Sequence, residues 1–134
     1  MDGRSIYSQY VKPLWAPPSW VIGLVWPFLY MIIAVSFGAV FYSAYKKQIP
    51  RAVALPFALN LIFNIAFPYF QFSLANNLLA SIDILLVVGS LMWALLAVWQ
   101  KAPKLRWVSY ANIPYLAWGV YATSVQLGIT YLNA

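Results

Sequence analysis

The chain has 134 residues, of which 64% are hydrophobic and 7% charged, with a formal net charge of +6 and a mean hydropathy of +0.77. A soluble domain carries roughly a quarter charged residues, so this composition indicates an integral membrane protein, and the length predicts a single domain over residues 1–134. Cys and His are absent, and Asp2 and Asp83 are the two acidic residues. Disulfides, Cys/His metal sites, thiol or histidine catalysis and a paired-carboxylate mechanism are therefore excluded, and we expect no catalytic and no metal-binding residues.

The chain begins with a polar and aromatic arm of 18 residues, which lacks the pattern of a signal peptide. Pro13, Pro17 and Pro18 each fix φ and remove a backbone donor, so regular helix is expected only after them. Trp15 and Trp20 suit the amphipathic level of a bilayer interface. The sequence therefore predicts a stiff segment that leads directly into a membrane helix.

Four apolar segments follow, each near the ~20 residues needed to cross a bilayer. They cover residues 19–45, 52–72, 77–99 and 107–131. The connections between them are short, which favours helices that run alternately up and down. The predicted fold is an all-α membrane protein, an antiparallel bundle of four transmembrane helices.

The basic residues predict the orientation of this bundle. Six of the eight lie in the first and third loops, which face the same side: Lys46, Lys47, Arg51, Lys101, Lys104 and Arg106. The positive-inside rule places loops 46–51 and 101–106 in the cytoplasm and both termini outside the cell membrane. Because the cations are confined to loops and flanks, there is no basic stripe for a duplex, and nucleic-acid binding is not expected.

Four prolines fall where a membrane helix should continue, at Pro27, Pro56, Pro68 and Pro114. Each could mark a bend that opens the bundle around a ligand. The alternative is that proline is simply commoner in membrane helices than in soluble ones. The sequence does not decide between these interpretations.

Polar side chains at membrane depth are few. Asn60 and Asn64 are one turn apart on the second helix, Asp83 lies in the second turn of the third, and Gln126 lies within the fourth. They could line a pocket or hold helices together by interhelical hydrogen bonds. For Asp83 the structural interpretation is favoured, because a carboxylate is stabilised near the positive end of a helix dipole.

Two helix faces carry aromatic side chains beside a small residue. On the first helix the face comprises Gly23, Trp26 and Tyr30. On the fourth, residues spaced by four are Pro114, Trp118, Ala122 and Gln126, flanked by Tyr115 and Tyr121. A large ring next to a small residue makes a slot for a flat aromatic ligand, although such a stripe is more often ordinary packing.

Several segments together resemble the TspO/MBR family (tryptophan-rich sensory protein / translocator protein). They are WAPPSWVIGLVWPFLY, ALNLIF, IDILLV and IPYLAWGVYATSVQLGITYLN, and the resemblance extends over about residues 7–133. It implies a helical membrane bundle that binds protoporphyrin IX or a haem-like tetrapyrrole, and in some members sterols, with no cofactor required. Members often form homodimers.

Carried over by position, the resemblance implies ligand-binding roles for Trp26, Tyr30, Asn60, Trp118 and Ala122. It implies that a lid over the pocket includes Trp15, Pro17, Pro18 and Trp20.

The sequence also departs from the family pattern. Members usually have five membrane helices, and this chain resembles a short form that lacks the first. Where the family has G-P-V-W this chain has Gly23-Leu24-Val25-Trp26, and Phe63 replaces the usual tryptophan after the pocket asparagine. Closure of the pocket is thus in question, and a homodimer that supplies the missing wall is one hypothesis.

Three functions are compatible with these residues. The leading one is tetrapyrrole binding in a sensory, transport, receptor or scavenging role. The second is light-dependent degradation of the bound porphyrin, with Trp26 and Trp118 as participants. The third is a small proton-coupled exporter that uses Asp83. Without His, Cys or a carboxylate pair, the sequence favours a binding protein over an enzyme.

Overall fold

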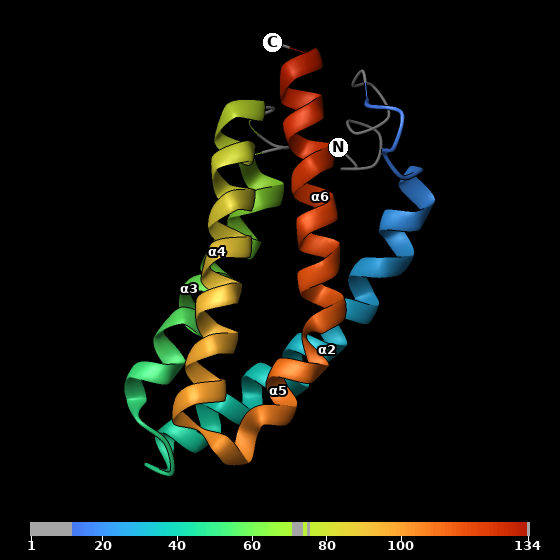
Figure 1. Ribbon diagram of the computed structural model, residues 1–134. Coiled ribbons are helices and arrows are strands. Elements are labelled where there is room, and N and C mark those ends of the chain that lie inside the picture. Colours follow the sequence, from blue (N-terminus) through green and yellow to red (C-terminus); the bar gives the residue numbers. More distant parts are fainter. Residues whose placement is uncertain (1–11, 71–73, 75, 134) are drawn as a thin grey trace.

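The structure, a computed structural model, describes residues 12–70, 74 and 76–133, and all regular structure in these ranges is helical. Its elements are α2 (Ser19–Tyr45), η1 (Arg51–Val53), α3 (Ala54–Pro68), α4 (Asn77–Lys101), η3 (Pro103–Leu105), α5 (Arg106–Ala111) and α6 (Ile113–Leu132). The four long helices α2, α3, α4 and α6 run alternately down and up (Figure 1).

Three stretches of the described chain are long and apolar enough to cross a membrane. They are Trp20–Tyr45, Arg51–Pro68 and Asn77–Lys101, and their mean hydropathies are 2.1, 1.4 and 2.2. The fourth long helix, α6, is about 30 Å long, which is the thickness of a bilayer core, but it is not among the helices apolar enough to be identified as a span. The protein is therefore an all-α membrane bundle, as the sequence predicted.

The last predicted span, residues 107–131, is two helices rather than one. A short α5 ends at Ala111, Asn112 interrupts the helix at φ −95°, ψ 8°, and α6 begins at Ile113. The cause is Pro114, which has no N–H to donate to the preceding turn and whose ring clashes with the carbonyl four residues back.

The second predicted helix, residues 52–72, corresponds to η1 followed by α3. α3 ends at Pro68, and residues 71–72 lie outside the described part of the chain.

The other prolines also occupy particular places. Pro56 lies in the first turn of α3 and Pro68 is its last residue. At the first turn of a helix the missing N–H would have had no intrahelical partner, so proline is tolerated there. Pro27 alone lies deep inside a described helix, and α2 continues through it. Of the four prolines expected to mark bends, Pro114 therefore accompanies an interruption of its predicted span, while Pro56 and Pro68 lie at the two ends of α3.

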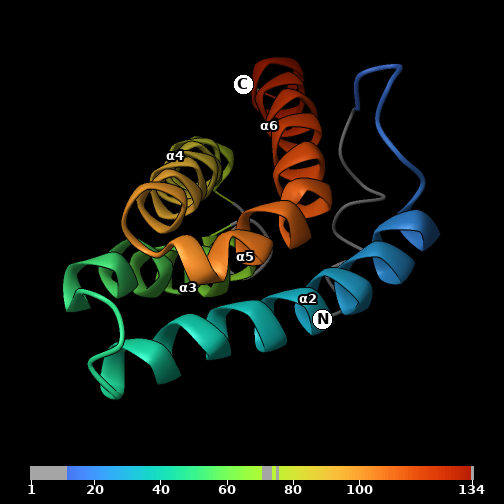
Figure 2. The same ribbon diagram turned by 60° about the horizontal axis from the view of Figure 1, so that its bottom comes forward.

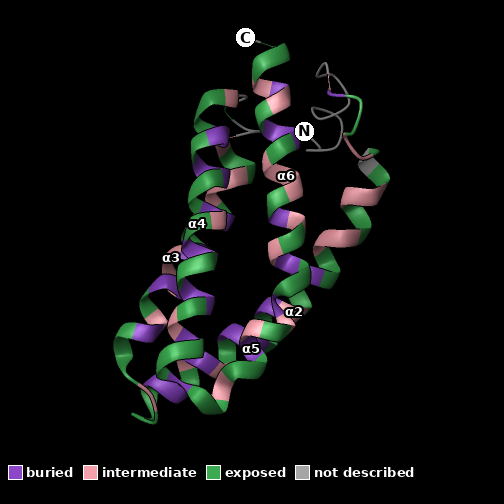
Figure 3. Cartoon of the chain, viewed as in Figure 1, coloured by how far each residue is buried: buried purple, intermediate pink, exposed green. Residues whose placement is uncertain are grey.

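The core is concentrated in the end of the bundle that holds the α2–α3 and α4–α5 connections (Figure 3). There Phe37 of α2 meets Phe57 of α3 edge to face, with ring centroids 4.8 Å apart. Val40, Leu91 and Val108 are fully buried around them. Above this core α2 leans away from α6. Two views show that the N-terminal half of α2 is separated from the C-terminal half of α6 (Figures 1 and 2).

The two basic loops lie at this same end of the bundle (Figure 1). Arg106 is fixed there, because its Nε donates to the Trp99 carbonyl at 3.0 Å and its guanidinium lies 4.6 Å from the centre of the Trp99 ring. The side of the membrane that this end faces remains a prediction from the charges.

Candidate functional site

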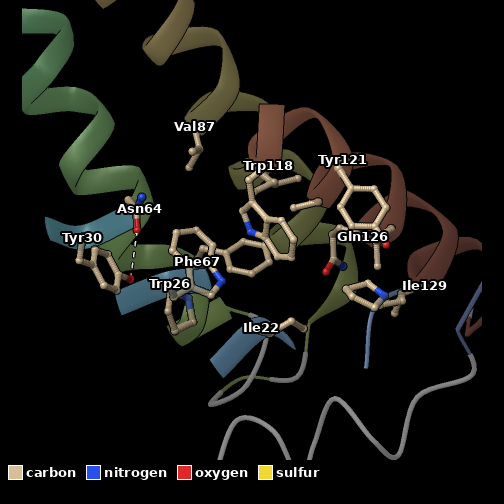
Figure 4. A pocket seen from close by; sticks show the side chains of 15 residues that line it. Ile22, Trp26, Tyr30, Asn64, Phe67, Val87, Trp118, Tyr121, Gln126 and Ile129 are labelled. Carbon is tan, nitrogen blue, oxygen red and sulfur yellow. Dashed lines mark hydrogen bonds between the residues drawn. The ribbon is translucent and has the colours of Figure 1, made fainter. Parts of the chain in front are cut away.

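A cavity of about 180 Å³ lies between the diverging helices. Its walls come from the arm, α2, α3, α4 and α6, and the side chains around it are almost all apolar or aromatic (Figure 4). The lining residues are Pro17, Ile22, Trp26, Tyr30, Asn64, Phe67, Pro68, Ile84, Val87, Trp118, Tyr121, Ala122, Val125, Gln126 and Ile129. None of these residues carries a formal charge, so the cavity suits an uncharged ring system.

Aromatic pairs on two opposing helices shape the walls. On α2 the rings of Trp26 and Tyr30 are 5.5 Å apart and tilted by 32°. On α6 the rings of Trp118 and Tyr121 are also 5.5 Å apart but nearly perpendicular, at 68°. Since helical residues three or four apart share a face, both rings of each pair line the cavity. Ala122 lies beside Trp118 and keeps the space next to its indole open.

A buried hydrogen-bond network lies directly beneath the cavity and connects three helices. Tyr115 of α6 accepts a bond from Asn64 Nδ2 at 2.7 Å and donates one to Asn60 Oδ1 at 2.9 Å. Asn60 Nδ2 in turn donates to the Val87 carbonyl at 2.8 Å and to Ser90 Oγ at 3.1 Å on α4. The Tyr115 hydroxyl therefore pairs with both amides, and a polar group in a bilayer requires such a partner.

The network reaches the cavity through one residue of α3. The Tyr30 hydroxyl donates to Asn64 Oδ1 at 3.5 Å, the interaction drawn as a dashed line in Figure 4. At that length the bond is weak. A ligand atom could replace either partner, whereas the bonds below it are short and buried.

A second polar cluster joins α4 and α6 on the far side of the cavity. Thr130 Oγ1 donates to the Asn77 carbonyl at 3.0 Å, and Ser81 Oγ lies 2.5 Å from the same hydroxyl. Gln126 Nε2 donates to Thr130 Oγ1 at 3.2 Å. Gln126 Nε2 also donates to the Asn77 carbonyl of α4 at 3.5 Å, and Gln126 lines the cavity.

The structure brings most of the predicted ligand-binding residues together. Those that line the cavity are Trp26, Tyr30, Trp118 and Ala122. Asn60 does not: its side chain is fully buried within the network, and Asn64, one turn further along α3, reaches the wall instead.

Of the predicted lid residues, Pro17 lines the cavity. The side chains of Trp15 and Trp20 are 55% and 62% exposed, and Pro18 is also exposed. Trp15 is nevertheless connected to the site, because its carbonyl accepts a hydrogen bond from the Tyr121 hydroxyl.

Several wall residues were not singled out from the sequence. They are Ile22, Phe67, Ile84, Val87, Val125 and Ile129. Val125 and Ile129 could have been found, since they continue the face of Trp118 and Ala122 at helical spacing. The others are ordinary apolar residues of a membrane helix and carry no distinguishing signal.

Asp83 lies outside the cavity. Its side chain is 3% exposed in α4, and Oδ2 has no hydrogen-bond partner among the residues that the structure describes. Because α3 and α4 are antiparallel and Asn60 contacts Val87, Asp83 lies about level with Asn64, one turn along each helix.

These features define a class: a helical membrane protein with an uncharged, aromatic internal cavity. Residues 1–132 match the sequence profile of the TspO/MBR family, and the chain belongs to that family. The tryptophan-rich protein TspO of Bacillus cereus is 37% identical over 130 residues, which are 97% of this chain and 82% of that protein. The uncharacterized membrane protein YtaB of Bacillus subtilis is 34% identical, over 95% of this chain and 79% of its own length. The human translocator protein is 32% identical, over 93% of this chain and 73% of its own length.

Proposed function

We propose that this membrane protein binds a flat, hydrophobic ligand of the tetrapyrrole class in the cavity, in a sensory, transport or scavenging role. The observation that carries the proposal is the pair of aromatic surfaces, Trp26 with Tyr30 and Trp118 with Tyr121, that face one uncharged space. Stacking on such surfaces, with a few polar groups to fix orientation, is how aromatic ligands are held.

Polar atoms available to a ligand support this proposal. The indole Nε1 of Trp118 is buried and has no hydrogen-bond partner among the described residues. An unpaired buried donor is costly, so a ligand that carries an acceptor, such as a carbonyl or an unprotonated ring nitrogen, would gain by meeting it. Asn64 and Gln126 offer further donors and acceptors.

The size of the cavity sets a requirement on the protein. A cavity of about 150 Å³ holds one benzene ring, and the cavity here measures about 180 Å³. A four-ring macrocycle therefore requires the walls to move apart. The first turns of α2, before the core residue Leu29, lean away from α6 and are the part of the wall that such a movement would involve (Figure 1).

The charged groups of a porphyrin must remain outside this uncharged cavity. The propionates would point toward the membrane interface at the arm, where Lys12 precedes Pro17 by five residues. An ionised carboxylate in the apolar interior would be far more costly than one at the interface.

The test is a titration of the purified protein in mild detergent with protoporphyrin IX, followed by tryptophan quenching and the porphyrin absorption band. We expect saturable binding that Trp118→Phe weakens about tenfold or more. Trp93→Phe is the matched control, since Trp93 is on the outer face of α4 and 48% exposed.

Two results would contradict the proposal. One is porphyrin partitioning that does not saturate. The other is equal weakening by Trp118→Phe and Trp93→Phe, which would show that the quenching reports on the detergent surface rather than on the cavity. Loss of the porphyrin band in light but not in the dark, abolished by Trp118→Phe, would favour degradation over simple binding.

A further inference from the structure

Six basic side chains gather at the end of the bundle that holds the α2–α3 and α4–α5 connections (Figure 1). All six are exposed, and none forms an ion pair within the described part of the chain. We call this surface the basic end; it comprises Lys46, Lys47, Arg51, Lys101, Lys104 and Arg106.

The described chain does not neutralise this charge. Asp83 is the one acidic residue in the part of the chain that the structure describes, and its side chain is buried. It lies on α4 well before Lys101, about 27 Å along the helix at 1.5 Å per residue. That separation is too large for an ion pair, so the basic end must find its counter-charges outside this part of the protein.

Exposed aromatic rings lie among these cations. Trp99 and Tyr110 pack against each other beside Arg106, and Trp107 follows it in the chain. Lys46 Nζ lies 5.7 Å from the centre of the Tyr42 ring. Exposed Trp and Tyr side chains of membrane proteins concentrate at the level of the lipid headgroups. The cations therefore lie at the depth of the lipid phosphates.

Arg106 is the cation that the structure holds most closely. Its Nε donates to the Trp99 carbonyl at 3.0 Å, and its guanidinium lies 4.6 Å from the centre of the Trp99 ring. Tyr110, one turn further along α5, packs edge to face on the same ring, with centroids 5.4 Å apart. The two Nη groups have no hydrogen-bond partner among the described residues. Such a planar pair of donors matches two oxygens of a phosphate.

The positive-inside rule accounts for the number of cations in these loops but not for this arrangement. A side chain needed only for its charge keeps its rotamer freedom in water. Arg106 is instead ordered, because it satisfies a carbonyl in the last turn of α4, where intrahelical donors are lacking. An ordered guanidinium binds an anion at a smaller cost in conformational entropy.

We propose that the basic end is a binding surface for the phosphate groups of anionic membrane phospholipids, with Arg106 on Trp99 as its fixed centre. Lys101 at the end of α4 and Lys104 in η3 add charge beside it. Basic clusters at the ends of membrane helices attract anionic lipids. A zwitterionic lipid also carries a phosphate, but its own ammonium group is repelled by these cations. The proposal does not depend on what the internal cavity binds.

The test is native mass spectrometry of the full chain in mild detergent, with equimolar phosphatidylglycerol and phosphatidylcholine that have identical acyl chains. We expect the wild type to retain phosphatidylglycerol at least about fivefold more tightly than phosphatidylcholine. Arg106→Gln should lower the affinity for phosphatidylglycerol roughly fivefold and leave that for phosphatidylcholine unchanged. Gln100→Ala is the matched control, because Gln100 is exposed at the same end and carries no charge.

Two further variants separate lipid binding from the structural role of Arg106. Lys104→Gln removes a charge from an exposed side chain that makes no hydrogen bond within the described residues. It should lower the affinity for phosphatidylglycerol roughly twofold to fivefold without changing thermal stability in lipid-free detergent. Arg106→Lys keeps the charge but loses the planar fork, so its affinity should fall between those of the wild type and Arg106→Gln.

Equal retention of the two lipids by the wild type would overturn the proposal. So would a preference for phosphatidylglycerol that neither Arg106→Gln nor Lys104→Gln reduces. Displacement of phosphatidylglycerol by millimolar inorganic phosphate would also contradict it, since the surface would then serve a soluble anion and not a membrane lipid. Wild-type affinity in Arg106→Lys would refute the role of the fixed guanidinium as the centre of the surface.

Discussion

Replacement of Tyr115 by Phe tests whether the buried network or the apolar packing holds the three helices together. The substitution keeps the ring, which is fully buried, and removes one oxygen. Two hydrogen bonds are lost, at 2.7 Å to Asn64 and 2.9 Å to Asn60, and both amides keep an unpaired atom. Interhelical hydrogen bonds in membranes contribute about 0.6 kcal/mol on average and about 1.7 at most. The expected loss of unfolding free energy is therefore about 1–3 kcal/mol.

The assay is reversible unfolding in mixed micelles, with sodium dodecyl sulfate as denaturant and helix content followed by circular dichroism. Tyr110→Phe is the control, because the Tyr110 ring is 65% exposed and an exposed substitution should change stability by less than about 0.5 kcal/mol. If Tyr115→Phe is as stable as the wild type, the network contributes nothing that van der Waals packing does not. If Tyr110→Phe is equally destabilising, the loss cannot be assigned to buried hydrogen bonds.

Three further predictions concern the cavity and the orientation of the bundle. Ala122→Phe should fill the space beside Trp118 and abolish saturable porphyrin binding, measured by absorption, while the outward-facing Val120→Phe, at a residue 55% exposed, should not. Asp83→Asn should leave the porphyrin affinity within about twofold of the wild-type value, since Asp83 is not a wall residue. If the protein were a proton-coupled exporter, transport in vesicles would instead fail in this variant. A cysteine at Gln48 should be protected from a membrane-impermeant maleimide in intact cells, and one at Leu132 should react; the reverse pattern would place the basic loops outside.

The fold was predictable because a bilayer imposes strong constraints. Every backbone group in hydrocarbon must be paired within its own segment, so long apolar runs separated by short loops become an antiparallel helical bundle. The sequence predicted at most a bend at Pro114, and the division into α5 and α6 was not predicted, because the neighbours of Asn112 are as apolar as a continuing helix and hydropathy does not register a lost backbone donor. The signal was Pro114 two residues later, which favours a helix start over a bend within one.

The sequence could predict those parts of the site that depend on residue spacing within a single helix. Spacing alone places Trp26 with Tyr30 and Trp118 with Ala122, since side chains three or four apart share a face. Spacing does not say which of two asparagines one turn apart reaches a cavity. That depends on how α3 packs on α4: Asn60 bonds Val87 and Ser90 of α4, whereas Asn64 lines the cavity.

The bilayer also explains why the cavity can exist and what kind of ligand it can select. Lipid tails are as apolar as leucine, so closing α2 onto α6 gains no hydrophobic free energy, and the diverging helices are not driven together. By the same reasoning, a hydrophobic ligand that arrives from the bilayer gains little from apolar burial alone, in contrast to one that arrives from water. Its affinity must come from ring stacking and from polar pairs with Trp118 Nε1, Asn64 and Gln126, which lipid cannot provide. Of two flat ligands equal in size and hydrophobicity, the one with a central hydrogen-bond acceptor should therefore be retained in nanodiscs, and the one without should partition into the lipid.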